Sequence, residues 1–196
     1  MTLLHINCCI SPNRKPRTAQ LAEAFISAYS AAHPDARVEE YVLETCGLTP
    51  LDKNALVSRD SLIRAGKSDA PCFAPARQFA SADRIVVSAP YWELSFPSML
   101  RVYIENISVL GVAFGYAENG RELGLCRAKR MIYLTCAGGQ IEGRDLGADY
   151  MRAMCGVFGI PHFDSVSAEN QDVIGGDGTE RLSAAVLRAA AIAKNF

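Results

Sequence analysis

Short apolar segments alternate with longer helical segments along this chain, and this alternation constrains the fold more than any other feature. The clearest strand covers residues 84–90, which are rich in β-branched side chains and end at a proline. The other expected strands are 3–8, 38–43, 130–136 and 163–168. The expected helices are 18–32, 52–65, 74–82, 97–107, 146–157 and 179–193. Asp177 and Glu180 resemble a capping box at the start of the last helix.

Five strands separated by helices predict a parallel sheet with helices on both faces. Residues 112–116 and 122–125 flank Asn119-Gly120, the strongest short hairpin signal, so we expect an added β-hairpin there. A chain of 196 residues corresponds to a single domain, residues 1–196. In such sheets ligands bind beyond the carboxyl ends of the strands. The segments after residues 8, 90, 136 and 168 are therefore the places to search for a site.

Composition argues against several classes of protein. Twenty basic and 21 acidic residues give a net charge of −1, without the basic excess of a nucleic-acid-binding protein. The seven cysteines show no CxxC spacing and no cluster with histidine, so we expect neither a zinc nor an iron–sulfur site. No apolar run approaches the roughly 18 residues of a membrane span. Scattered cysteines and an N-terminus unlike a secretion signal favour a cytoplasmic protein.

The first candidate loop, residues 8–18, lies between the first strand and the first helix. Arg14, Lys15 and Arg17 place three cations within four positions, next to a helix N-terminus whose free amides also favour an anion. The loop has no glycine-rich dinucleotide or P-loop pattern. It fits a phosphate group, and an equally good alternative is a solvated basic turn in which Thr18 only caps the helix.

The same loop allows a second chemistry. Cys8 and Arg14 have the cysteine–arginine spacing of low-molecular-weight phosphatases and arsenate reductases. That chemistry needs a thiolate inside a ring of backbone amides, with arginine holding the oxyanion. Pro12 donates no N–H to such a ring, and Lys15 replaces the hydroxyl residue that usually follows the arginine. A phosphatase or arsenate reductase is therefore a remote alternative.

The second candidate loop, residues 89–97, gathers three aromatic side chains and one carboxylate after the clearest strand. Aromatic rings provide flat apolar walls for a planar heterocycle. The alternative is that Tyr91 and Phe96 belong to the core and Trp92 to an interface.

The third candidate loop, residues 135–140, contains the pair Gly138-Gly139 after a buried strand. Paired glycines allow a backbone to approach a ligand closely, although a simple tight turn would also use them. All three loops fall at the carboxyl ends of strands. A phosphate on the first loop and a flat ring between the other two would describe FMN.

Taken together, these segments resemble the FMN-dependent NADH-azoreductases and the related NAD(P)H:quinone oxidoreductases. The resemblance covers nearly the whole chain and rests on residues 16–25, 89–94, 114–120, 136–139 and 156–160. It implies a flavodoxin-like α/β fold. In that fold a doubly wound five-stranded parallel sheet has the order 2-1-3-4-5, with helices on both faces, and here the added hairpin lies near residues 112–125.

The resemblance also implies site residues, matched position by position. Those implied at the cofactor are Cys9, Ser11, Pro16, Arg17, Thr18, Pro90, Tyr91, Trp92, Glu93, Leu94, Cys136, Ala137, Gly138 and Gly139. Those implied at the substrate are Tyr116 and Val157. The chain departs from the family where Trp92 and Glu93 replace a tyrosine and an asparagine, and where Cys9 and Cys136 replace residues that are often serine. A carboxylate at Glu93 would oppose negative charge on a reduced flavin unless only its backbone faces the ring.

The activity implied by the resemblance is reduction of quinones, azo compounds or nitroaromatics by NADH or NADPH, with hydride passing in two steps through bound FMN. Because the cofactor supplies this chemistry, we expect no catalytic acid or base side chain. The amides near Gly138 and Gly139 are expected to stabilise charge on the reduced ring. Members of the family are generally homodimers whose flavin site uses residues from both subunits, and the resemblance implies the same for this chain. The other reading is a flavodoxin-type electron carrier without NAD(P)H activity of its own.

Overall fold

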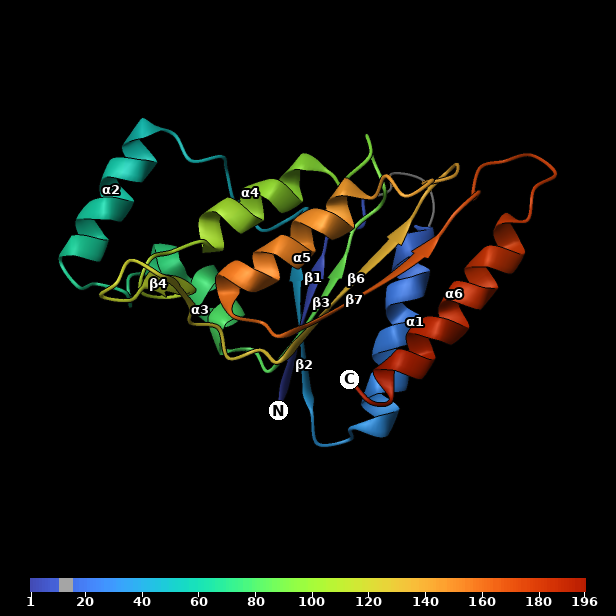
Figure 1. The fold of residues 1–196 in the computed structure, drawn as a ribbon, viewed down its shortest axis with the longest axis horizontal. Helices are drawn as coiled ribbons and strands as arrows, with labels where there is room; N and C mark the ends of the chain where they lie inside the picture. Colours follow the sequence, from blue (N-terminus) through green and yellow to red (C-terminus); the bar gives the residue numbers. More distant parts are fainter. Residues whose placement is uncertain (11–15) are drawn as a thin grey trace.

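A parallel sheet of five strands lies between two layers of helices (Figure 1). The computed structural model describes residues 1–10 and 16–196. The sheet order is β2-β1-β3-β6-β7, and every neighbouring pair is parallel. The strands are β1 (Thr2–Asn7), β2 (Arg37–Val42), β3 (Arg84–Ser88), β6 (Arg130–Cys136) and β7 (His162–Ala168). The predicted flavodoxin-like order 2-1-3-4-5 is confirmed, with β6 and β7 as its fourth and fifth strands.

Each face of the sheet is covered by its own helices (Figure 1). On one face lie α1 (Arg17–Ala32) and α6 (Gly178–Ala193), which pack with the strands in one apolar cluster. On the other face lie α3 (Ala74–Ser81), α4 (Ser98–Ile107) and α5 (Leu146–Phe158). Alternation along the central strand β3 sends Val86 to the first cluster and Ile85 and Val87 to the second. This double burial explains its nearly continuous apolar sequence.

The remaining elements gather at one end of the molecule. They are α2 (Lys53–Arg64), a 3₁₀ turn (Pro71–Phe73) and the antiparallel hairpin of β4 (Phe114–Tyr116) and β5 (Glu122–Gly124). The predicted hairpin is therefore present, with Gly120 in its turn at a φ of 77°. A Cβ at Gly124 would overlap the backbone of Phe158 and Gly159. Glycine there lets the hairpin pack directly against the carboxyl end of α5.

The expected capping box of α6 is wrong. Asp177 occupies the N-cap position, but its side chain accepts no hydrogen bond from the helix backbone. Its carboxylate oxygens instead accept from Asn170 Nδ2 (2.9 Å) and Arg181 Nε (2.7 Å). Asn170 of the preceding loop and Arg181 of α6 thus bind this carboxylate in place of the helix amides.

None of the helices in the described part of the chain combines the length and the apolar character that crossing a bilayer requires.

Candidate functional site

A cavity of about 400 Å³ opens at the edge of the sheet where β1, β3, β6 and β7 end. Its walls come from four segments that are far apart in sequence. The lining residues are Ile10, Pro16, Arg17, Thr18, Pro90, Tyr91, Trp92, Cys136, Ala137, Gly138, Gln171 and Asp172. The topology predicts this location, because ligands of doubly wound sheets bind beyond the carboxyl ends of the strands.

One wall of the cavity is the N-terminus of α1. Pro16 is the N-cap residue, and the first hydrogen bond of the helix runs from Gln20 N to Pro16 O (3.2 Å). The N–H groups of Arg17, Thr18 and Ala19 precede that bond and have no acceptor within the helix. Together with the positive end of the helix dipole they favour an anion. The Arg17 guanidinium also lies here, with its Nη1 2.6 Å from Asp172 Oδ1.

The loop after β3 provides an aromatic wall. Tyr91 is fixed at both ends, because its N–H donates to Cys136 O (3.0 Å) and its hydroxyl donates to Arg144 O (3.0 Å). Trp92 is 48% exposed and lines the cavity. A flat apolar surface that is partly open to solvent can stack against a planar ring.

Immediately after Trp92 the chain makes a strained turn. Reciprocal backbone hydrogen bonds join Trp92 and Ser95 (3.1 and 2.8 Å), and Glu93 and Leu94 between them have φ values of 50° and 67°. Residues other than glycine, asparagine and aspartate rarely adopt this left-handed backbone conformation. The Glu93 side chain is exposed and does not line the cavity. The Glu93 carboxylate, which was expected to oppose negative charge on a reduced flavin, therefore does not lie on the cavity wall.

The loops after β6 and β7 are joined by backbone hydrogen bonds. Gln171 N donates to Ala137 O (3.0 Å), Asp172 N to Gly138 O (2.9 Å) and Asn170 N to Gly139 O (3.1 Å). The amides of Gly138 and Gly139 donate to no acceptor among the described residues. Of these two donors, the amide of Gly138 belongs to a residue that lines the cavity, and the amide of Gly139 is the next in the chain.

The cysteines at this edge are weak nucleophiles. Burial raises the pKa of Cys8 to about 12 and the pKa values of Cys9 and Cys136 to about 11. The reactive form of cysteine is the thiolate, which these pKa values make scarce near neutral pH. Cys8 is also completely buried. The structure thus argues against the phosphatase reading, whose arginine, Arg14, lies outside the described residues.

Comparisons with known proteins agree with this geometry. A family model described as "Flavodoxin-like fold" matches residues 1–192. The chain belongs to this flavodoxin-like family. An FMN-dependent NADH:quinone oxidoreductase of Clostridium beijerinckii is 34% identical over 201 aligned residues, covering 99% of this chain and 98% of that protein. One from Coprothermobacter proteolyticus is 31% identical with the same coverage.

A structural comparison gives the same picture. The crystal structure of an azoreductase from Bacillus anthracis is similar with a TM-score of 0.88 and 25% identity, covering 100% of this chain and 99% of that one. The resemblance to azoreductases and quinone oxidoreductases of this flavodoxin-like family is therefore confirmed.

Most residues that the family resemblance places at the cofactor meet at the cavity. Those that line it are Pro16, Arg17, Thr18, Pro90, Tyr91, Trp92, Cys136, Ala137 and Gly138. Cys9, Glu93, Leu94 and Gly139 are neighbours in sequence of lining residues but do not line it, and Ser11 lies outside the described residues. That these residues contact a cofactor stays a prediction.

Three lining residues were not singled out from the sequence. Ile10 follows the first strand, and Gln171 and Asp172 follow the last. The topology indicated the segment after residue 168, but no residue type there stood out as a ligand. Their place in the cavity depends on the backbone bonds between the loops after β6 and β7.

The two residues expected at the substrate do not reach this cavity. Tyr116 is 59% exposed on β4, and Val157 lies near the carboxyl end of α5. The amino end of α5, at Leu146, adjoins the cavity loops through a hydrogen bond from Leu146 N to Leu94 O (3.0 Å). A helix of 13 residues is about 18 Å long between its first and last residues. Within one chain, Tyr116 and Val157 therefore lie at the far end of α5.

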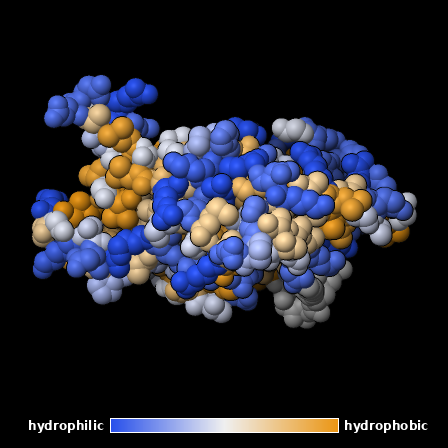
Figure 2. Space-filling view, turned by 90° about the horizontal axis from the view of Figure 1, so that it is seen from below, coloured by the Kyte–Doolittle hydropathy of each residue, from blue (hydrophilic) through white to orange (hydrophobic). Residues whose placement is uncertain are grey.

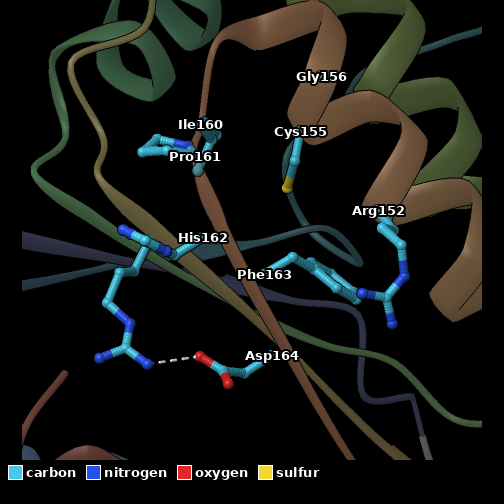
Figure 3. A pocket seen from close by; sticks show the side chains of 9 residues that line it. Arg152, Cys155, Gly156, Ile160, Pro161, His162, Phe163 and Asp164 are labelled. Atoms are coloured by element: carbon cyan, nitrogen blue, oxygen red, sulfur yellow. Dashed lines mark hydrogen bonds and ion pairs between the residues drawn. The ribbon is translucent and has the colours of Figure 1, made fainter.

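A second cavity of about 480 Å³ lies where β6 and β7 begin (Figure 3). Its two arginines have different partners. Arg130 Nη2 is 2.8 Å from Asp164 Oδ2, and the Arg152 guanidinium carbon is 4.8 Å from the centre of the Phe163 ring. None of the three candidate loops contributes to it.

Proposed function

We propose that this protein is an FMN-dependent NAD(P)H:quinone oxidoreductase that accepts quinones, azo compounds or nitroaromatics. The observation that carries the proposal is the meeting of three strand-end loops around one cavity. The names of the relatives at 34% and 31% identity support the cofactor, the donor and the quinone acceptor. The name of the structural neighbour supports azo compounds.

The cavity fits FMN in size and in chemistry. Its volume of about 400 Å³ falls in the range of about 300–1,000 Å³ typical of small-molecule sites. The N-terminus of α1, with Arg17, suits the phosphate; Tyr91 and Trp92 suit the ring; and the amides of Gly138 and Gly139 suit its polar edge. A Cβ at Gly138 would lie 2.7 Å from Asp172 Oδ2, so a side chain there would crowd this wall.

FMN, when bound, supplies the two-electron chemistry between a nicotinamide donor and the acceptor. The residues of the chain bind and orient. The α1 amides would hold the phosphate, the aromatic wall would orient the ring, and the two glycine amides would stabilise negative charge on the reduced ring. We assign no side chain as a catalytic acid or base.

An absorption experiment tests this function against the electron-carrier alternative. The purified protein, supplied with FMN, should be yellow, and NADH or NADPH should bleach it rapidly without air. Addition of a quinone should restore the colour. Bleaching that needs a separate reductase would instead support a carrier, and a protein that stays colourless in excess FMN would contradict both readings.

We also propose a homodimer in which a second copy completes the substrate side of the cavity. Apolar side chains gather at the left end of the molecule (Figure 2), where Figure 1 places α2 and the hairpin. The exposed apolar residues of these segments are Leu56, Val57, Leu110, Tyr116, Leu123 and Leu125. Trp92, Leu94 and Leu146 form a second exposed apolar group beside the cavity. A two-fold axis can place the hairpin of each copy over the cavity of the other.

Subunit mixing tests the dimer. Tyr116→Ala should raise the KM for quinone while leaving FMN binding intact, and Gly138→Val should weaken FMN binding about 100-fold. Co-expression of the two variants with different tags should give mixed dimers in which one site has both an intact cavity and an intact hairpin. Recovery of activity in these mixed dimers supports the proposal. A monomer in sedimentation experiments, or no recovery, contradicts it.

The proposed location is the cytoplasm. All seven cysteines are free thiols in the structure, and reduced cysteines are typical of that compartment. Measurement of the oxidation state of the thiols in freshly lysed cells would test this.

A further inference from the structure

A group of buried polar side chains lies beneath the cofactor cavity and has no role in the proposed chemistry. His5 is 4% exposed and Ser88 is fully buried, on the face of the sheet covered by α1. His5 Nε2 is 2.8 Å from Ser88 Oγ, and His5 Nδ1 is 3.2 Å from Glu40 Oε1. Buried polar groups are costly unless they are hydrogen-bonded, so an ordered histidine–serine pair at this place invites a functional explanation.

The His5–Ser88 pair is part of a closed ring of hydrogen bonds that also includes Cys9, Asn7 and Glu40. Cys9 Sγ donates to Ser88 Oγ (3.4 Å), and Cys9 N donates to Asn7 Oδ1 (2.9 Å). Asn7 Nδ2 donates in turn to Glu40 Oε1 (2.9 Å), the same oxygen that faces His5. Three neighbouring strands thus hold both the backbone and the thiol of Cys9. The next residue, Ile10, lines the cavity.

The charge of His5 decides the direction of these hydrogen bonds. Burial lowers the pKa of His5, and Glu40 opposes that shift. In neutral His5, the Nδ1 proton faces the Glu40 carboxylate, so Nε2 accepts from the Ser88 hydroxyl. The Ser88 oxygen is then open to the Cys9 thiol proton, which points away from the cavity.

Protonation of His5 reverses this direction. Both ring nitrogens of an imidazolium are donors, so Nε2 must donate to Ser88 Oγ. The Ser88 hydroxyl proton then turns toward Cys9 Sγ. The Cys9 thiol keeps its proton but no longer donates it to Ser88. One proton from solvent forms the new N–H bond at His5 Nε2, and no other covalent bond forms or breaks.

We propose that His5 is a positioning residue for the cofactor phosphate, because its protonation turns the Cys9 thiol from Ser88 toward the anion bound at α1. The inference rests on the proposed FMN-dependent function. Cys9 lies close enough to Cys136, which lines the cavity, for a charge on one to raise the pKa of the other. A thiol is a weak donor, but a donor aimed at an anion makes a stronger bond than one aimed at a neutral oxygen.

Among the described residues, few other charged groups face this ring. Glu40 on β2 is the charged group that acts on His5. Cys9 and Cys136 have pKa values of about 11 and stay neutral where histidine titrates. Arg17 at the start of α1 acts on Cys136 and pairs with Asp172. The group that changes charge inside the ring is therefore His5, and because burial lowers its pKa this change falls on the acid side of neutrality.

The test compares FMN with riboflavin, which lacks the phosphate, by flavin-fluorescence titration from about pH 5 to about pH 8. Ser88→Ala removes the acceptor that holds the thiol; the remaining Ser88 carbonyl is 3.7 Å from Cys9 Sγ. Cys9→Ala removes the donor. Ser108→Ala and Cys72→Ala are matched controls, since Ser108 bonds within α4 to Ile104 O (2.7 Å) and Cys72 is exposed.

The FMN affinity of the wild-type protein should match that of Cys9→Ala at high pH and that of Ser88→Ala at low pH. Near pH 8, Ser88→Ala should bind FMN about fivefold more tightly than wild type, and Cys9→Ala should equal wild type. Near pH 5, wild type should equal Ser88→Ala and bind about fivefold more tightly than Cys9→Ala. The phosphate titrates near pH 6 in every protein, so only ratios between proteins at one pH are compared. Riboflavin and the two controls should show no such change.

Other results would overturn the inference. A merely structural Ser88 predicts weaker FMN binding in Ser88→Ala at every pH. A constant ratio of wild type to Cys9→Ala, or the same pH effect with riboflavin, would also contradict it, and the Cys9→Ala ratio decides alone if Ser88→Ala does not fold. A wild-type protein that binds no FMN would overturn the proposed function as well, which separates the two failures.

Discussion

The two cavities at opposite ends of the sheet are similar in volume, about 400 and about 480 Å³, but differ in what forms their walls. The cavity at the carboxyl edge is lined by loop backbone and a helix N-terminus, with amide donors left open. The other is lined mainly by side chains, among which Arg130 pairs with Asp164 and Arg152 lies over the Phe163 ring (Figure 3). Volume alone would favour the second, whereas the amides of a helix N-terminus favour the first.

Backbone strain also differs between the surroundings of the two cavities. The non-glycine residues with positive φ in the described chain are Glu93, Leu94, Glu142 and Asn170, and all lie in loops that follow β3, β6 or β7. At the second cavity the left-handed position before β7 is filled by Gly159, at a φ of 74°. Strain of about 1–3 kcal/mol per residue persists where the surroundings enforce it, and it clusters at functional sites.

A pair of glycine substitutions should separate the cavities most sharply. Gly138→Val adds a side chain to the first cavity, where even a Cβ would lie 2.7 Å from Asp172 Oδ2. Valine is chosen because Asp172 could move aside for a lone methyl group. We expect FMN affinity to fall about 100-fold, which equals about 2.7 kcal/mol. Equilibrium titration of flavin fluorescence measures this.

The matched control is Gly156→Ala in the second cavity, where a Cβ meets no atom within 4 Å. FMN binding should not change, and the helix should gain about 0.5–1 kcal/mol of stability because alanine replaces glycine within α5. If Gly156→Ala weakened FMN binding as strongly as Gly138→Val, the functional distinction between the two cavities would be wrong.

Gly159 and Leu94 both have a left-handed backbone, and substitutions at these two positions should change stability in opposite directions. Gly159→Ala introduces strain, and its Cβ would lie 2.9 Å from Gly124 Cα, so we expect a loss of about 2 kcal/mol. Leu94→Gly relieves strain and should raise stability by up to about 1 kcal/mol while loosening the cavity turn. Urea unfolding measures both changes. A stability loss in Leu94→Gly would show that its side chain contributes more than its backbone costs.

The sequence predicted the sheet well because its signals are local. Residues 84–90 are β-branched and nearly continuous, and such a run has few alternatives to a buried strand. The topology rule then indicated all four segments that line the cavity. The contribution of Gln171 and Asp172 was missed, because it depends on hydrogen bonds to the loop after β6, more than 30 positions earlier.

The hydrogen-bonded ring around His5 likewise could not be predicted from the sequence. Nothing local distinguishes His5 from a histidine that simply packs in a strand. Its partners Glu40 and Ser88 are 35 and 83 positions away, and only the register of β2-β1-β3 brings them together. Tyr116 illustrates the converse: the family resemblance implied that it forms a substrate wall, but the fold places it at the far end of α5. Sequence patterns identified types of residue, while the pairing of strands decided which of them meet.

The smallest expected effect concerns the ion pair at each cavity. Asp172→Asn removes a negative charge 2.6 Å from the Arg17 guanidinium and leaves that cation to the FMN phosphate. We expect FMN to bind about three- to tenfold more tightly, with riboflavin unchanged. The matched change, Asp164→Asn, breaks the Arg130 pair at the second cavity, and it should lower stability by about 0.5–1 kcal/mol without affecting FMN. Both effects are measured at low ionic strength, because salt screens exposed charges. Weaker FMN binding in Asp172→Asn would mean that Asp172 orients Arg17 for the phosphate rather than competing with it, and the carboxylate would then count among the binding residues of the first cavity.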